Sequence, residues 1–168
     1  MIAVDTSLLA LAINRYVPEH GRAVSVLEGL VHGDTPWALP WPAVEEFLAT
    51  VTHPHRVARV LAPRDAWGFV AELGASPAVR WLGAGERHGA ALAEVLELAE
   101  VSGPLPPGFA LAVVLREHGV RQLLTVDRAM RRFRFLDAID PLHGEPWTPA
   151  SAPPRRYRRL TRPGAAGR

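Results

Sequence analysis

Two aspartates stand where a parallel α/β sheet would place a site. Asp5 follows one short apolar run and Asp127 follows another, and each lies near a hydroxyl residue, Thr6 or Thr125. In open α/β sheets, ligands bind beyond the carboxyl ends of the strands. Aspartate is also a common N-cap of the helix that follows such a strand. The pattern leaves two interpretations open, a pair of helix caps or a shared site.

Two further acids, Glu45 and Glu46, fall on a predicted helix close to the end of another predicted strand. Carboxylates that converge on one spot repel each other, and a hard cation such as Mg²⁺ relieves that repulsion. The acids therefore predict a metal site at the edge of the sheet where these strands end.

The chain alternates short apolar runs with helical segments, which is typical of a parallel sheet covered on both faces. The predicted strands cover residues 1–4, 36–39, 79–82, 122–126 and 138–139. Helices are predicted over residues 8–13, 18–31, 42–52, 63–74, 86–101 and 109–118, and Asp127 is expected to cap a short basic helix. In helix 86–101 the apolar face consists of Ala91, Val95, Leu98 and Val101. The predicted fold class is α/β.

The composition excludes several classes of protein. The 168 residues include no cysteine, so disulfide frameworks and zinc–thiolate sites are excluded. The longest apolar run, residues 109–115, is too short to span a bilayer, and no signal-peptide pattern precedes Asp5. We therefore expect a soluble, cytoplasmic protein with no membrane partner. Its length suits one domain with its own core.

Charge is distributed unevenly along the chain. Residues 151–168 contain six arginines and no acid, whereas residues 1–150 carry 13 arginines and 17 acids, a net charge of −4. We predict a folded domain over residues 1–147 and a basic, disordered tail over residues 148–168. Arginine-rich segments bind RNA in some proteins, and solubility or codon bias explains the same run.

Several motifs in a fixed order resemble one family. They are, in chain order, Ala3-Val4-Asp5-Thr6-Ser7-Leu8-Leu9, Leu39-Pro40-Trp41-Pro42-Ala43-Val44-Glu45-Glu46-Phe47-Leu48, Thr52-His53-Pro54, Glu117-His118-Gly119-Val120, Leu124-Thr125-Val126-Asp127-Arg128 and Asp140-Pro141-Leu142. Over residues 1–142 the chain resembles a PIN-domain ribonuclease, in particular the VapC-type toxins of bacterial toxin–antitoxin pairs.

The resemblance implies a PIN-like three-layer α/β/α sandwich with a parallel sheet of about five strands. It also implies Mg²⁺-dependent (or Mn²⁺-dependent) hydrolysis of RNA, a cognate antitoxin protein as partner, and a homodimer. The family's acids fall on Asp5, Glu46 and Asp127, which would be both catalytic residues and metal ligands. Thr6 or Thr125 would add a hydroxyl contact, and Glu45 is the less favoured of the two adjacent glutamates.

The chain departs from the family pattern at three positions. The family's third acid falls on Gly108, a further acid falls on Ala129, and the phenylalanine after it falls on Met130. Mg²⁺ binds weakly to sparse carboxylates because it gives up its water reluctantly. We therefore expect reduced ribonuclease activity. The alternative is a catalytically degenerate PIN domain that binds RNA or an antitoxin.

An unrelated receiver-like or dehalogenase-like protein is disfavoured, because Asp5 has no second aspartate two residues on and the chain contains no lysine. Arg128, Arg131 and Arg132 follow Asp127, where an RNA backbone would approach, and a solvated helix face explains them equally well. The five tryptophans are expected in the core or at an interface rather than as platforms for RNA bases: Trp37, Trp41, Trp67, Trp81 and Trp147.

Overall fold

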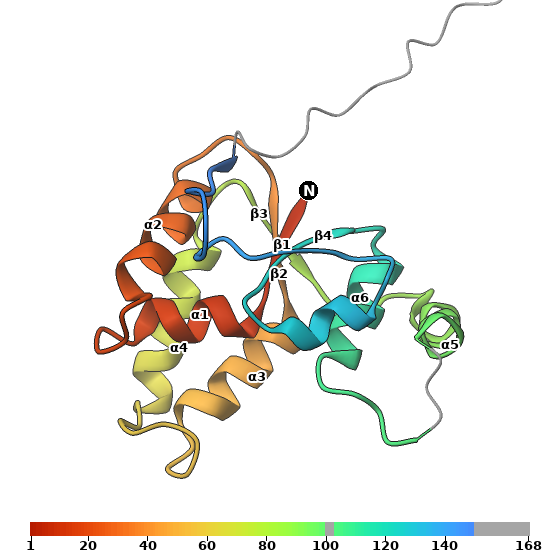
Figure 1. Ribbon diagram of the computed structural model, residues 1–168, viewed down its shortest axis with the longest axis horizontal. Helices are drawn as coiled ribbons and strands as arrows, with labels where there is room; N and C mark the ends of the chain where they lie inside the picture. The colour runs from red at the N-terminus through yellow and green to blue at the C-terminus, as the bar shows by residue number, and fades with distance from the viewer. Residues whose placement is uncertain (100–102, 150–168) are drawn as a thin grey trace, which may run out of the picture.

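The computed structural model describes residues 1–99 and 103–149, and within them the chain forms one parallel sheet with helices on both sides (Figure 1). The strands are β1 (Ile2–Val4), β2 (Trp37–Pro40), β3 (Val79–Leu82), β4 (Gln122–Leu124) and β5 (Asp137–Ile139). The helices are α1 (Thr6–Ile13), α2 (His20–Val31), α3 (Trp41–Val51), α4 (Pro63–Gly74), α5 (His88–Leu98), α6 (Phe109–Glu117) and the 3₁₀ helix η1 (Arg128–Arg132). The predicted α/β class and five-stranded parallel sheet are confirmed.

Two buried clusters lie on opposite faces of the sheet. Val4 and Leu124 belong to the cluster that α1, α2, α3 and α4 cover, whereas Ala3 and Leu123 belong to the cluster that α5, α6 and η1 cover. Successive residues of a strand point to opposite faces, and the strands are apolar on both. This arrangement is the predicted three-layer sandwich.

The strand order, β3-β2-β1-β4-β5, puts a topological switch point between β1 and β4. The chain leaves β1 through α1 on one face, and it leaves β4 through η1 on the other. Because β1 and β4 are adjacent and parallel, the two connections diverge at their carboxyl ends. Ligands of open α/β sheets bind at such a switch point.

Strand β4 ends at Leu124, two residues before the predicted end. The backbone N–H of Val126 donates to the hydroxyl of Ser7 at 3.2 Å rather than to a neighbouring strand. The chain therefore turns away from the sheet after Thr125, whose N–H still donates to the carbonyl oxygen of Ile139, and this turn carries Asp127.

The predicted apolar face of helix α5 is only partly correct. Ala91 and Val95 are buried, but Leu98 is 50% exposed, and Val101 lies outside the described residues. Helix α5 packs against α6 at the margin of the molecule (Figure 1), and Leu98 is not part of the buried cluster that contains Ala91 and Val95.

The turn after α6 ties that helix to the start of α5. Glu117 Oε1 accepts hydrogen bonds from the backbone N–H groups of Gly85 and Arg87 at 3.0 and 3.1 Å, and Oε2 contacts His88 Nδ1 at 2.8 Å. Burial by itself would raise the pKa of Glu117, and the hydrogen bonds from His88 and Gly85 outweigh it, so that the pKa is lowered.

The tryptophans divide between core and surface. Trp37 is fully buried as predicted, whereas Trp41 and Trp67 are about half-exposed and stack on each other with ring centroids 6.4 Å apart.

Of the predicted tail, only Thr148 and Pro149 lie within the described residues, so the domain boundary stays a prediction. Among the described helices, none has the length and apolar character that crossing a membrane requires.

Candidate active site

Asp5 follows β1 directly, and its side chain contacts hydroxyl groups of α1 and of the segment after β4. Its Oδ2 accepts hydrogen bonds from the hydroxyls of Thr125 at 2.5 Å and Ser7 at 2.7 Å. The residue is 5% exposed, and its carboxylate makes no capping bond to α1. Of the two interpretations open for Asp5, the structure therefore favours a site residue over a helix cap.

Thr6 joins the start of α1 to α3 and brings Glu46 to the same edge of the sheet. Its hydroxyl lies 3.0 Å from the carbonyl oxygen of Ala43 and 3.1 Å from Glu46 Oε2, and its single proton is shared between these two acceptors. Glu45 is exposed and has no such contact. Glu46, the preferred member of the pair, is also exposed, but it contacts Thr6, the residue that follows Asp5.

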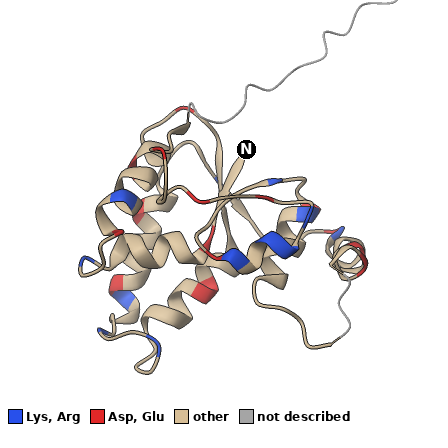
Figure 2. Ribbon diagram, viewed as in Figure 1, with Lys and Arg blue, Asp and Glu red and all other residues tan. Residues whose placement is uncertain are grey.

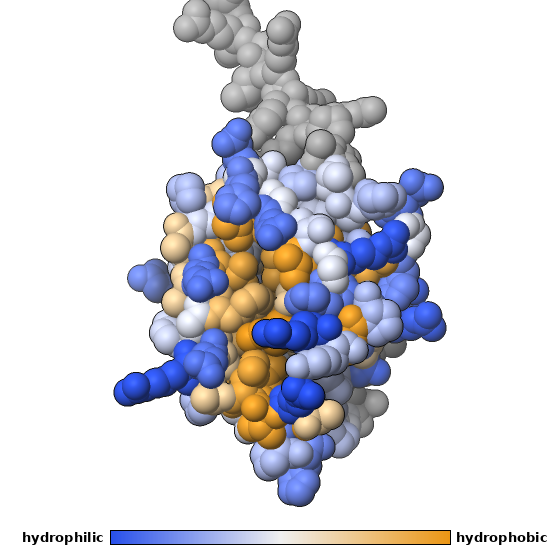
Figure 3. Space-filling view, turned by 90° about the vertical axis from the view of Figure 1, so that its left-hand side faces the viewer, coloured by the Kyte–Doolittle hydropathy of each residue, from blue (hydrophilic) through white to orange (hydrophobic). Residues whose placement is uncertain are grey.

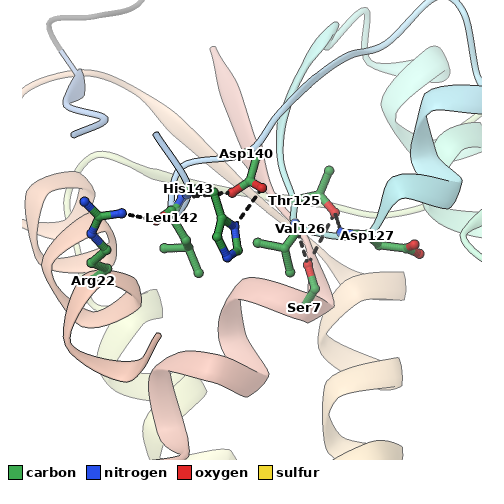
Figure 4. Close-up of polar contacts among 8 residues, drawn as sticks. All are labelled: Ser7, Arg22, Thr125, Val126, Asp127, Asp140, Leu142 and His143. Atoms are coloured by element: carbon green, nitrogen blue, oxygen red, sulfur yellow. Dashed lines mark hydrogen bonds and ion pairs between the residues drawn. The ribbon is translucent and has the colours of Figure 1, made fainter. Parts of the chain in front are cut away.

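Asp127 behaves as a helix cap. Its Oδ1 accepts a hydrogen bond from the backbone N–H of Ala129 at 2.8 Å, at the start of η1. Its own backbone N–H donates to the hydroxyl of Thr125 at 2.9 Å. Figure 4 shows the Asp127 carboxylate pointing away from Ser7 and Thr125. The structure thus joins Asp127 to the site through its backbone and directs its carboxylate to η1.

The expected cluster of three carboxylates does not form in the part of the chain that the structure describes. No three His, Cys, Asp or Glu side chains there are grouped so that they could hold a metal ion. The physical reason is that the carboxylate of Asp127 satisfies the start of η1 instead of facing Asp5. The prediction of a three-acid arrangement is wrong for this conformation.

Two carboxylates remain for a cation, from Asp5 and Glu46. No described residue donates a hydrogen bond to Asp5 Oδ1 or to Glu46 Oε1. Mg²⁺ is commonly held by one or two carboxylates and completes its octahedral shell with water and substrate phosphate oxygens. The donor set present therefore fits a loosely held Mg²⁺ ion.

The resemblance assigns the family's third acid to Gly108, where the backbone conformation and the side chain of Met130 both disfavour a larger residue. Gly108 precedes α6 with φ of +75°, in the left-handed region that favours glycine. A Cβ built on Gly108 would overlap with the sulfur of Met130 on η1. The two departures from the family pattern, at Gly108 and at Met130, therefore contact each other.

The structure adds two residues that the sequence reasoning did not select. Asp140 follows β5 directly, and its Oδ1 accepts from the backbone N–H groups of Leu142 and His143 at 3.0 and 3.2 Å. Its Oδ2 lies 2.9 Å from His143 Nδ1. The signal was present in the sequence, since an acid directly after a short apolar strand is the same pattern that selected Asp5.

The arginines after Asp127 lie on the surface. Arg128, Arg131 and Arg132 are all exposed on η1, and Figure 2 shows η1 as a basic element close to the carboxyl end of the sheet. None of them forms an ion pair within the described residues. Their charges are therefore available to a polyanion.

No family model matches this sequence. Ribonuclease VapC43 of Mycobacterium tuberculosis (strain ATCC 25618 / H37Rv) is 32% identical over 145 residues, which are 86% of this chain and 98% of the relative. Ribonuclease VapC48 of the same strain is 29% identical over 140 residues, 83% of this chain and 97% of the relative.

Solved structures show the same fold. The sarcin-ricin loop cleaving toxin VapC20 of Mycobacterium tuberculosis has a TM-score of 0.53 at 18% identity, over 76% of this chain and 91% of its own. VapBC2 from Rickettsia felis, bound to a DNA fragment from its promoter, has a TM-score of 0.55 at 14% identity, over 81% of this chain and 96% of its own. FitAB bound to the IR36 DNA fragment has a TM-score of 0.55 at 19% identity, over 86% of this chain and 98% of its own.

The similarity to VapC43 extends over nearly all of the relative, and the described fold is the one that these toxin structures share. The chain therefore belongs to the VapC ribonuclease family.

Proposed function

We propose that this chain is an Mg²⁺-dependent endoribonuclease that hydrolyses RNA phosphodiester bonds at the carboxyl ends of β1 and β4. The observation that carries the proposal is the placement of Asp5 and Glu46. Both acids lie at the switch point of the sheet, and hydroxyl groups orient one oxygen of each. The names of the relatives, which are ribonucleases, support the same reaction.

Asp5 and Glu46 would hold the cation through their remaining oxygens, and Mn²⁺ suits the same oxygen ligands. A bound Mg²⁺ activates water and neutralises the charge that builds on the phosphate oxygens. Ser7 and Thr125 fix the orientation of Asp5, and Thr6 fixes that of Glu46. Such supporting contacts keep ligands in the geometry that binding needs.

Activity is expected to be reduced compared with a site of four acids. Gly108 and Ala129 supply no carboxylate, and Asp127 is engaged as the cap of η1. The ion therefore depends on water and on the phosphate of the RNA for most of its shell. Cleavage should be most efficient at millimolar Mg²⁺ or with Mn²⁺.

RNA would approach over η1, where Arg128, Arg131 and Arg132 are exposed. Arginine–phosphate contacts release counterions, so binding through them weakens steeply as salt rises. These contacts position an RNA backbone without reading its sequence.

An antitoxin protein is the expected partner, as the names of the VapBC2 and FitAB complexes support. Figure 3 shows apolar surface among polar residues on the side of the molecule that α1, α2 and α4 occupy. Tyr16 lies between α1 and α2, Val60 between α3 and α4, and Trp67 on α4; they are 62%, 50% and 45% exposed. Exposed apolar surface of this kind marks protein–protein contacts, and it suits either an antitoxin or the second copy of a homodimer.

A second candidate function is that of a binding protein without catalysis, which the cap formed by Asp127 and the closed position at Gly108 favour. The test is purified protein on labelled RNA with Mg²⁺ or Mn²⁺, beside an Asp5→Asn variant and a sample with a chelator. The proposed function requires cleavage that both the chelator and Asp5→Asn abolish. RNA that binds but stays intact would establish the binding protein instead.

A further inference from the structure

Asp140 belongs to the same row of residues as Asp5 and Thr125. Val4, Leu124 and Ile139 are register partners across β1, β4 and β5. The pairing continues one residue further along each strand. The backbone N–H of Asp5 donates to the carbonyl oxygen of Leu124 at 3.1 Å, and the backbone N–H of Thr125 donates to the carbonyl oxygen of Ile139 at 2.9 Å.

Adjacent strands are about 4.8 Å apart. The backbone of Asp140 therefore lies about one strand spacing from Thr125, whose hydroxyl binds Asp5. The Asp140 segment is thus part of the same edge as the candidate active site.

The segment after β5 is held rigidly, which a positioned catalytic group requires. Leu142 is buried at 2% exposure, and its carbonyl oxygen accepts a hydrogen bond from the guanidinium of Arg22 on α2. Gly144 follows with φ of +97°, which turns the chain away directly after His143. His143 is therefore presented at a fixed place at this end of the sheet (Figure 4).

Asp140 and His143 form a carboxylate–imidazole pair in which Nδ1 of the imidazole faces the carboxylate and Nε2 does not. Burial by itself would raise the pKa of Asp140, but hydrogen bonds from Leu142 and His143 outweigh it and lower that pKa. The ionised carboxylate keeps the proton of His143 on Nδ1, where the two side chains meet. The side chain of His143 is 62% exposed, and its Nε2 has no hydrogen-bond partner among the described residues. In hydrolytic enzymes, a carboxylate fixes an imidazole in this way so that the far nitrogen can transfer a proton.

We propose that His143, oriented by Asp140, donates the proton that the leaving ribose oxygen takes up when the RNA strand is cut. The proposal rests on the ribonuclease function proposed above. In the step, a water oxygen bonds to phosphorus, and the bond from phosphorus to the leaving oxygen breaks. His143 enters the step as an imidazolium with a proton on each nitrogen; Nδ1 keeps its proton against Asp140, and the proton on Nε2 passes to the leaving oxygen. The proton released by the attacking water passes to solvent. Solvent then reprotonates the imidazole.

The first test compares RNA with a phosphodiester whose leaving group is p-nitrophenolate, an anion that departs without a proton. His143→Gln should lower kcat on RNA about 100-fold, the usual scale of general-acid catalysis, with KM little changed. The p-nitrophenyl diester should be cleaved at the rate of the native protein. Equal losses on both substrates, or none on either, would overturn the proposal.

Two variants provide controls. Asp140→Asn keeps an oxygen for the backbone N–H groups of Leu142 and His143 but loses the charge, so it should lower kcat on RNA without a loss of melting temperature. Combined with His143→Gln it should cause no further loss, because the two residues act as one unit. His55→Gln alters an exposed histidine beyond the far end of α3 and should leave cleavage unchanged.

A second readout does not need cleavage. The imidazole NMR signal of His143 is assigned as the one that is missing in the spectrum of His143→Gln. With a chelator present to prevent cleavage, addition of an RNA oligonucleotide should shift this signal and leave the His55 signal in place. A His143 signal that does not move would refute the contact whether or not the protein cleaves RNA. A signal that moves in a protein without activity would refute the proposed ribonuclease function and the proton transfer that rests on it, and would leave only the contact between His143 and RNA.

Discussion

The sulfur of Met130 occupies the space that a side chain at residue 108 would need. Gly108 precedes α6 and Met130 lies on η1, and a Cβ on Gly108 would overlap with Met130 Sδ. Met130 is 1% exposed, so it fills this space as part of the core. Gly108 and Met130, two positions at which the sequence departs from the pattern it resembles, therefore contact each other in the packed structure.

Gly108→Asp is expected to destabilise the protein rather than simply restore a ligand. A non-glycine residue at φ of +75° costs about 1–3 kcal/mol, and Met130 must also move aside. Thermal melting measures the effect. In a double-mutant cycle with Met130→Ala, the double variant should be more stable than the sum of the two single losses, because the alanine makes room for the aspartate.

An added carboxylate is expected to raise the affinity for Mg²⁺. The gain should appear in the double variant of Gly108→Asp and Met130→Ala, where the aspartate fits, and titration calorimetry measures it. Simple additivity in the cycle would show that residues 108 and 130 do not contact each other.

Thr125→Val is expected to weaken Mg²⁺ binding 10- to 100-fold, the scale found when a residue supporting a metal ligand is removed. The valine cannot donate to Asp5 Oδ2 or accept from the N–H of Asp127. The free energy of unfolding should fall by roughly 1 kcal/mol for the lost hydrogen bonds. Mg²⁺ titration and chemical denaturation measure the two effects.

Thr125→Ser is the matched control, because it keeps the hydroxyl and should retain most of the affinity for Mg²⁺. A serine variant as weak as the valine variant would mean that the methyl group, and not the hydroxyl, matters at this position.

Asp127→Asn and Asp127→Ala distinguish a cap from a metal ligand. Asparagine caps helices as well as aspartate does, so Asp127→Asn should keep both stability and Mg²⁺ affinity close to native values. Asp127→Ala should lose about 1 kcal/mol of stability because the N–H of Ala129 loses its acceptor. Melting and Mg²⁺ titration of both variants give the answer. A loss of metal affinity in Asp127→Asn as large as in Asp5→Asn would restore Asp127 to the metal shell.

Glu117 makes stability depend on pH in the acid range. Its pKa in the folded protein lies below the ordinary value of 4.5, since hydrogen bonds from His88 and Gly85 stabilise the charged form. The unfolded state therefore binds protons more readily, and the stabilisation present above pH 4.5 is lost as the pH falls through the folded pKa.

Glu117→Gln should remove this part of the pH dependence while the hydrogen bonds from the N–H groups of Gly85 and Arg87 persist. Melting temperatures between pH 3 and pH 7 (roughly the range over which carboxylates titrate) should converge for the two proteins at the acid end. Parallel melting curves over the whole range would argue against a role for the Glu117 charge.

The sequence by itself determined the order of the elements and the residue that ends β1. Short apolar runs and breaker residues act over a few positions, so the helix at Pro63–Gly74 and the strand at Val79–Leu82 were predicted with their observed bounds. The preference for Glu46 over Glu45 follows from the resemblance, since Glu46 is the acid that directly precedes Phe47-Leu48 in the motif.

Only the tertiary structure decided how the strand-end acids are used. Asp5 and Asp127 follow similar apolar runs, yet one carboxylate faces the hydroxyls of Thr125 and Ser7 and the other caps η1. Asp140 joins the same edge only through the register of β5 with β4, and Gly108 meets Met130 only where α6 passes η1. These relationships depend on pairing and packing between segments distant in the chain, and no local pattern of residue types carries that information.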